Sequence, residues 1–379
     1  MKLKITTNYN FLIIHLMKNL SKYSFIFIIC TQISFSQVRV VKELDSNWKF
    51  QKGFFKNAFE VDFDDSKWES ISVPHDWAIY GPFDKEVDIQ NVAIVQNGEE
   101  IASEKTGRTG ALPHIGSAWY RNKFEIQKNE IGKKVILLFE GAMCEPQVFL
   151  NGKKIGEWAY GYSYFYFDVS EYIKEGENIL SVQLSNKEFA SRWYPGAGLY
   201  RKVSIIIKNK ESINQWGTFI TTPFISTTSA KVNVKTKTSG DNSRLVISIF
   251  DANGQKICSE EAATQFGNEF EQNLKVLNPQ LWSPENPYLY TAVSQLYIEN
   301  ELKDEITTRF GIRDIKYEAN KGFSLNGEVR KFKGVCLHHD LGPLGAAVNK
   351  AALRRQLTIL KDLGCNAIRS SHNMPLLNN

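Results

Sequence analysis

The most informative part of the sequence, FKGVCLHHDLGPLGAAVNKAALRRQLTILKDLGCNAIRSSHNMP, runs from Phe332 to Pro375. Residues 332–337 form a short run rich in large apolar side chains, which is typical of a buried strand. A helix is expected after Asn349, and a second strand over residues 365–369. The stretch therefore predicts a strand, a loop, a helix and another strand.

The helix has a start signal, a stop signal and one apolar face. Asn349 can accept a hydrogen bond from a free backbone N–H of the first turn. Gly364 stands where helices commonly end in a left-handed residue. The apolar stripe recurs at steps of four, three and three residues, at Leu353, Leu357, Leu360 and Leu363.

A strand–helix–strand unit of this size is a right-handed parallel crossover, the repeating unit of an α/β barrel. Both strands end in polar residues, and such folds place their active sites at the carboxyl ends of the strands. The polar residues are His338, His339 and Asp340 after the first strand, and Arg369, Ser370, Ser371, His372 and Asn373 at the second. A serine hydrolase fits poorly, because these serines lack the G-x-S-x-G elbow.

These residues carry a family resemblance. The motif N-A-I-R-S-S-H-x-x-P (Asn366–Pro375), preceded by G-V-x-x-H (Gly334–His338), resembles the first two barrel strands of glycoside hydrolase family 2. That family contains the β-galactosidases, β-glucuronidases and β-mannosidases. Here Asn373-Met374-Pro375 replaces the usual Tyr-Pro type pair, which indicates a variant loop entry.

The sequence of residues 37–209 predicts an all-β domain. Asn151-Gly152 between two short apolar runs is a hairpin signal, and Leu180, Val182 and Leu184 alternate with polar residues. Short strands at this spacing predict a two-sheet jelly roll. In the aromatic run Tyr164–Phe167, we expect alternate members to fill the sandwich core rather than form a sugar-binding surface.

This segment resembles the family's N-terminal sugar-binding domain. The matching features are Val73–Trp77, Ala118–Arg121, Val148–Gly152 and Arg192–Arg201. The last is similar to the β-galactosidase branch. Arg192 occupies a position where some β-galactosidases have an aspartate that reaches the substrate, so Arg192 is a candidate sugar contact. Alternatively, Arg192 has a structural role and forms an ion pair at the boundary between this domain and the barrel.

Residues 210–310 form a second β region. Lys231–Thr238 alternates strictly, and Leu245–Phe250 leads to the turn Asn253-Gly254. Trp282–Tyr290 closely resembles a sequence of the family's immunoglobulin-like domain, and about 100 residues suit a seven-stranded sandwich. Residues 311–379 are then the truncated start of a TIM-barrel domain. The expected fold class is mainly β and multidomain.

Residues 1–36 are expected to be a signal peptide. Lys18 and Lys22 precede the apolar run Tyr23–Cys30, and small residues precede Gln37. Met17 is a plausible true start. The apolar run is too short for a stable membrane anchor, and Cys30 lacks the small preceding residues of a lipid-attachment site. The protein is expected to be secreted or periplasmic.

Composition excludes some functions. The 379 residues are 42% hydrophobic and carry a net charge of +5, with basic residues scattered among acidic ones. No basic stripe indicates nucleic acid. Four cysteines remain after the signal peptide: Cys144, Cys258, Cys336 and Cys365. None forms a CxxC pair, and we expect small buried core residues rather than zinc ligands.

The resemblance assigns roles to residues of the barrel strands. His338 and His372 match histidines that bind the sugar at the cleavage site, and imidazole can both donate to and accept from hydroxyls. Arg369 matches a position whose guanidinium can orient a catalytic carboxylate. His339 and Asp340 could simply face solvent in their loop.

Hydrolysis also needs two carboxyl groups, about 5–5.5 Å apart in a retaining enzyme. The family's two catalytic glutamates lie on later barrel strands, beyond Asn379, so no catalytic residue is assigned in this chain. A complete barrel needs about 250 residues. We therefore expect an incomplete barrel in this chain, with an exposed strand edge and an exposed helix face.

The function expected is therefore the N-terminal part of a secreted retaining β-galactosidase, inactive on its own. The alternatives are a carbohydrate-binding scaffold without catalysis, or a β-glucuronidase or β-mannosidase fragment. The expected partner is a carbohydrate, and the full-length enzyme could form a homo-oligomer. No cofactor or metal site is assigned in this chain, since magnesium or sodium ligands of the family would lie beyond its end.

Overall fold

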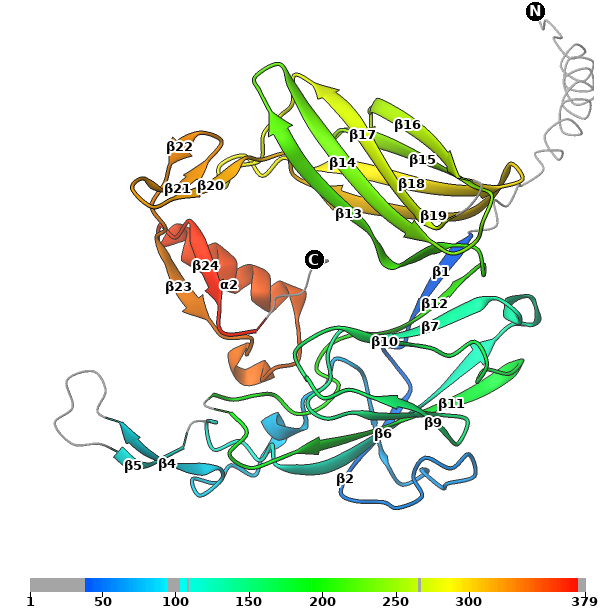
Figure 1. The fold of residues 1–379 in the computed structure, drawn as a ribbon. Helices are drawn as coiled ribbons and strands as arrows, with labels where there is room; N and C mark the ends of the chain where they lie inside the picture. The colour runs from blue at the N-terminus through cyan, green and yellow to red at the C-terminus, as the bar shows by residue number, and fades with distance from the viewer. Residues whose placement is uncertain (1–37, 95–102, 108, 192, 265–266, 374–379) are drawn as a thin grey trace, which may run out of the picture. The chain divides into compact units, whose positions relative to one another are not determined.

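The computed structural model describes residues 38–94, 103–107, 109–191, 193–264 and 267–373. They form two β-sandwiches, followed by a short segment that contains the strand–helix–strand unit (Figure 1). The mainly β, multidomain fold predicted from the sequence is confirmed. The predicted signal peptide lies outside the described residues.

The first sandwich consists of two antiparallel sheets. One sheet has the strand order β1 (Arg39–Glu43), β12 (Val203–Lys208), β7 (Lys134–Phe139), β10 (Phe165–Asp168). The other has the order β3 (Glu69–Ile71), β2 (Trp48–Lys52), β6 (Gly116–Ile126), β11 (Gly176–Asn186), β8 (Gln147–Leu150), β9 (Lys153–Glu157). A separate hairpin pairs β4 (Ile89–Ile94) with β5 (Ser103–Gly107).

The core of the first sandwich lies between these two sheets. Leu180, Val182 and Leu184 of β11 are fully buried, as their alternation predicts. They belong to the same cluster as Leu137 and Phe139 of the opposite sheet. Phe165 also belongs to this cluster and Phe167 packs against it, while Tyr166 is exposed. The prediction that alternate members of the aromatic run fill the core is confirmed.

The second sandwich has the seven strands that its sequence predicts. A three-stranded sheet has the order β13 (Ile213–Ile225), β14 (Ser229–Thr238), β17 (Glu269–Leu277). A four-stranded sheet has the order β16 (Lys256–Thr264), β15 (Ser243–Phe250), β18 (Tyr290–Ile298), β19 (Glu301–Phe310). Val232 and Val234 of β14 face its core, in line with the predicted alternation.

A buried ion pair connects the two sandwiches. Arg39 of β1 donates to both carboxylate oxygens of Asp304 in β19, at 2.9 and 2.5 Å. The Asp304 carboxylate also accepts a hydrogen bond from the Ile213 backbone N–H and has no exposed side-chain surface. The carboxylate is therefore fully satisfied by neighbours from both sandwiches.

The last segment begins with a small sheet and continues into the strand–helix–strand unit. The small sheet contains β20 (Ile315–Glu318), β21 (Gly322–Leu325) and β22 (Glu328–Val329). The unit contains β23 (Gly334–Leu337), α2 (Lys350–Asp362) and β24 (Ala367–Ser370). Strands β23 and β24 pair in parallel, with Leu337 opposite Ser370. The described residues also contain three short 3-10 helices: η1 (Trp77–Tyr80), η2 (Lys128–Glu130) and η3 (Gly342–Leu344).

The local signals of this segment are confirmed. The Asn349 side chain accepts a hydrogen bond from the Ala352 N–H at 3.0 Å, and Gly364 has φ +86°. Helix α2 has no buried residue, and Leu357 and Leu363 of the apolar stripe are exposed. The predicted open helix face is therefore present. Within the described ranges, no helix has the length and apolar character needed to cross a membrane.

The prediction of four buried core cysteines is wrong. Cys336 is exposed, because it lies on β23, whose face is not covered by other described residues. Cys144, Cys258 and Cys365 are only half-buried. Cys144 and Cys258 pack against the edges of the two sandwich cores, and all four thiols are free.

Candidate functional site

The paired strands β23 and β24 bring two predicted sugar-binding residues together. His338 follows β23 directly, and His372 lies two residues beyond β24. Because the strands are parallel and in register, their carboxyl ends meet at one edge of the pair. The imidazole ring centroids are 5.6 Å apart and the rings are nearly perpendicular. We call these two residues the histidine pair.

Trp193 of the first sandwich packs against both members of the histidine pair. Its ring centroid lies 5.4 Å from that of His338 and 5.1 Å from that of His372. The Trp193 indole N–H donates a hydrogen bond of 3.2 Å to the Tyr162 hydroxyl, which fixes the indole orientation. Residues far apart in the sequence thus form one aromatic and imidazole cluster.

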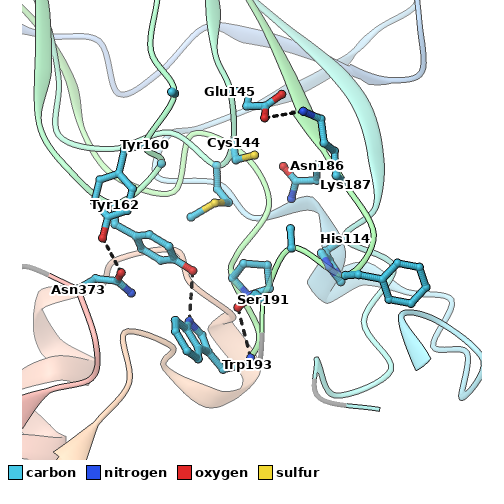
Figure 2. A pocket seen from close by; sticks show the side chains of 16 residues that line it. His114, Cys144, Glu145, Tyr160, Tyr162, Asn186, Lys187, Ser191, Trp193 and Asn373 are labelled. Carbon is cyan, nitrogen blue, oxygen red and sulfur yellow. Dashed lines mark hydrogen bonds and ion pairs between the residues drawn. The ribbon is translucent and has the colours of Figure 1, made fainter. Parts of the chain in front are cut away.

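A second connection reaches the loop after β24. The Tyr160 hydroxyl donates a hydrogen bond of 2.8 Å to the Asn373 side-chain oxygen (Figure 2). Asn373 belongs to the variant loop entry identified in the sequence. The departure from the family pattern therefore supplies a direct contact with the first sandwich.

His339 does not face solvent, contrary to one interpretation of the sequence. Its Nε2–H donates to the Pro195 carbonyl at 3.1 Å, and its ring packs on Tyr162 with centroids 5.0 Å apart. Burial lowers the pKa of His339 to about 4, so the side chain is neutral at pH 7. His339 therefore anchors the loop to the sandwich, while His338 next to it joins the histidine pair.

Asp76 anchors the same loop from the sandwich side. Its buried carboxylate accepts hydrogen bonds from the Tyr194 hydroxyl at 2.6 and 2.7 Å and from the Ala346 backbone N–H at 2.8 Å. Desolvation raises the pKa of Asp76. The approach is close: a Cβ on Gly345 would collide with the Asp76 carboxylate, and one on Gly196 would lie 2.6 Å from the Ala346 Cβ.

Of the other two predicted site residues, the structure describes Arg369 but not Arg192. Arg369 lies on β24, and its guanidinium is 3.4 Å from the Cys336 sulfur and 3.5 Å from the Ser371 hydroxyl. Its side chain thus lies along the strand pair. Arg192 lies outside the described residues, although its neighbours Ser191 and Trp193 are described.

An open pocket of about 660 Å³ lies beside the Trp193 ring (Figure 2). Three loops of the first sandwich and Asn373 form most of its wall. The lining residues are His114, Met143, Cys144, Glu145, Ala159, Tyr160, Gly161, Tyr162, Asn186, Lys187, Phe189, Ala190, Ser191, Trp193, Pro195 and Asn373. The sequence indicated no role for Trp193, Tyr160 or Asn373, although Trp193 lies in the segment Arg192–Arg201 and Asn373 in the variant loop entry.

Comparison with known proteins agrees with this architecture. Residues 41–209 match the model of the glycosyl hydrolases family 2 sugar binding domain, and residues 212–313 match the glycosyl hydrolases family 2 model. The chain belongs to glycosyl hydrolases family 2. The family predicted from the barrel-strand and sandwich motifs is thereby confirmed.

Relatives in the family carry two kinds of activity in their names. Beta-galactosidase BoGH2A from Bacteroides ovatus is 38% identical over 357 residues, an alignment that covers 91% of this chain and 40% of the relative. A putative beta-glucuronidase from Formosa agariphila is 34% identical over 338 residues, covering 88% of this chain and 31% of the relative.

Solved structures in the family share the fold. A glycosyl hydrolase family 2 member from Bacteroides cellulosilyticus matches with a TM-score of 0.79 at 32% identity, covering 89% of this chain and 43% of the other. The Bacteroides uniformis beta-glucuronidase matches with a TM-score of 0.73 at 26% identity, covering 88% and 40%. The chain spans less than half the length of each of these four proteins.

Proposed function

We propose that this chain is the N-terminal part of a secreted, retaining glycoside hydrolase that acts on terminal β-galactosides. The observation that carries the proposal is the histidine pair, with rings 5.6 Å apart and both rings packed against Trp193. Imidazoles can exchange hydrogen bonds with sugar hydroxyls in either direction. An aromatic ring beside them suits the apolar face of a sugar.

The roles proposed for the individual residues follow from their chemistry. His338 and His372 would contact hydroxyls of the sugar at the cleavage site. Arg369 would orient a carboxylate by charge-assisted hydrogen bonds, and Arg192 would contact the sugar from the first sandwich. The cluster formed by the histidine pair, Trp193, Tyr160 and Asn373 contains no carboxylate. The acid and the nucleophile of a retaining mechanism, about 5–5.5 Å apart, would be supplied by further barrel strands.

The galactoside preference rests on two supports. The Arg192–Arg201 segment is similar to the β-galactosidase branch, and BoGH2A is a beta-galactosidase by name. The relative from Formosa agariphila is a putative beta-glucuronidase by name, which makes a β-glucuronidase the second candidate.

The test compares this chain with the product of the reading frame extended through the downstream DNA. We expect the extended protein to cleave aryl β-galactosides faster than aryl β-glucuronides, and the 379-residue chain to cleave neither. In the extended protein, His372→Ala should lower kcat/KM about 100-fold or more, since a contact that strengthens in the transition state is lost.

Two outcomes would contradict the proposal. Faster cleavage of the glucuronide would assign the second candidate function. Turnover by the 379-residue chain that His372→Ala abolishes would show that the essential carboxylates lie within this chain.

A further inference from the structure

The pocket beside Trp193 has the size and lining of a ligand site. Its volume of about 660 Å³ falls within the range of about 300–1,000 Å³ that is typical of small-molecule pockets. Four aromatic residues line it: Tyr160, Tyr162, Phe189 and Trp193. Trp193 also packs on the histidine pair, so the pocket adjoins the place where the proposed function puts a sugar.

Phe189 is held at this pocket by a costly backbone arrangement. Its φ is +56°, a conformation that is rare for a bulky residue, and its side chain is 63% exposed. The Phe189 backbone N–H donates a hydrogen bond of 2.8 Å to the buried carboxylate of Asp88, which stabilises this conformation. Strained backbone conformations of this kind cluster at functional sites. The arrangement keeps a large apolar ring at the pocket instead of in the core.

Two amides of the lining carry polar atoms that the described residues leave unpaired. Asn186 is 6% exposed, and its Nδ2 donates to the Gly196 carbonyl at 3.0 Å, which fixes the amide. Its Oδ1 has no hydrogen-bond partner among the described atoms. Asn373 is the reverse case: its Oδ1 accepts from Tyr160, whereas its Nδ2 has no described partner. Buried polar atoms are rarely left unpaired, so a ligand that donates and accepts hydrogen bonds would satisfy both.

The charges on the described lining residues are balanced. Lys187 forms an ion pair with Glu145, with 2.6 Å between Nζ and Oε1 (Figure 2). His114 is almost fully buried, and burial lowers its pKa, so the side chain is neutral at pH 7. These described residues therefore leave no unpaired charge that would select an acidic ligand.

We infer that this pocket binds a neutral sugar unit, next to the unit that contacts the histidine pair. Sugars combine apolar ring faces, which pack on aromatic side chains, with hydroxyls that both donate and accept hydrogen bonds. This inference rests on the proposed function, because the histidine pair defines the neighbouring unit. The pocket then holds the leaving-group side of a disaccharide whose galactosyl unit lies at His338 and His372.

The experiment uses the 379-residue chain and lactose, with saturation-transfer NMR reporting which sugar protons contact the protein. We expect saturation of both the galactosyl and the glucosyl unit. Phe189→Ala should reduce saturation of the glucosyl unit selectively and weaken lactose binding about 2- to 10-fold, the loss of one aromatic contact. Phe54→Ala is the matched control, because Phe54 is 73% exposed in the same sandwich and does not line the pocket.

The outcomes separate this inference from the proposed function. Lactose that does not bind, or a glucosyl signal that Phe189→Ala and Phe54→Ala leave equally unchanged, would overturn the inference. Methyl β-glucuronide competing better than methyl β-glucoside would overturn the neutral-sugar assignment. The proposed function fails in a different way, when His372→Ala leaves the galactosyl signal intact.

Discussion

The first sandwich and the strand–helix–strand unit contain similar apolar residues but bury them very differently. Leu180 in β11 is fully buried between two sheets, whereas Leu357 in α2 is 40% exposed and its helix has no buried residue. The sandwich is stabilised by its own core. The unit is held by the hydrogen bonds and ring contacts of its loops with the sandwich. A site can therefore be positioned by the anchoring of its loops even where the strands and helix that carry it contribute little hydrophobic core.

The largest expected effect comes from one substitution made in both regions. Leu180→Ala should lower the free energy of unfolding by about 3–5 kcal/mol, because it leaves a cavity between packed sheets. Leu357→Ala should cost about 1 kcal/mol or less, since its side chain is already partly in water. Urea denaturation of both variants measures the two values. Equal losses would show that the different burial of these two leucines does not decide their contributions to stability.

A second effect concerns the connection between the two sandwiches. Arg39→Met leaves the buried Asp304 carboxylate without its guanidinium partner. Breaking such a pair can cost about 3–5 kcal/mol. We expect about 2–3 kcal/mol, because the Ile213 N–H still binds Asp304.

The matched control is Lys123→Met at the exposed Lys123–Glu177 ion pair, which should change the free energy of unfolding by about 1 kcal/mol or less. If both methionine variants were equally stable, the connection between the sandwiches would not depend on a buried charge.

The smallest effect is a pH response of the loop anchored by His339. Burial lowers the pKa of His339 from its ordinary 6.5 to about 4, so the unfolded or undocked state binds a proton first as the pH falls. The stabilisation by neutral His339 is therefore complete above about pH 6.5 and is lost as the pH falls towards 4. The protection of residues 338–349 against hydrogen–deuterium exchange, corrected for the pH dependence of the intrinsic exchange rate, should therefore decrease as the pH falls across this range.

His339→Gln is the matched variant, because glutamine can donate to the Pro195 carbonyl but does not titrate. His75 is also buried and has a pKa of about 4, so global stability responds to acid in both proteins. Only the difference between the acid responses of the unsubstituted protein and of His339→Gln reports on the loop. An identical acid response in the variant would show that His339 does not control docking.

Local signals made much of the fold predictable. The predicted turn at Asn151-Gly152 adopts left-handed conformations with φ of +51° and +80°, and Asn326 has φ +53° in the turn between β21 and β22. Asn349 caps its helix as predicted. These features depend on a few neighbouring residues, whose steric and hydrogen-bonding preferences can be evaluated without knowing the rest of the chain.

The candidate site was only partly predictable. The proximity of His338 and His372 follows from a parallel strand pair, which the sequence indicates. The contact of Trp193 with both rings depends on docking between segments more than 140 residues apart, and no local pattern encodes it. The burial of Cys336 was mispredicted for a related reason: small apolar character indicates a preference for the interior, but only the tertiary structure decides which face is covered.

The tight approach of Gly196 to Ala346 and of Gly345 to Asp76 has a consequence for protein engineering. Each glycine on one side is matched to an atom on the other, so the sugar binding domain and the loop after β23 have complementary surfaces. A chimera that takes these two parts from different family members would bring together surfaces that did not evolve as partners. Recombination between such enzymes should therefore place its crossover after Asn373, so that these glycine contacts and the contacts of Trp193 and Tyr160 with His372 and Asn373 all come from the same parent.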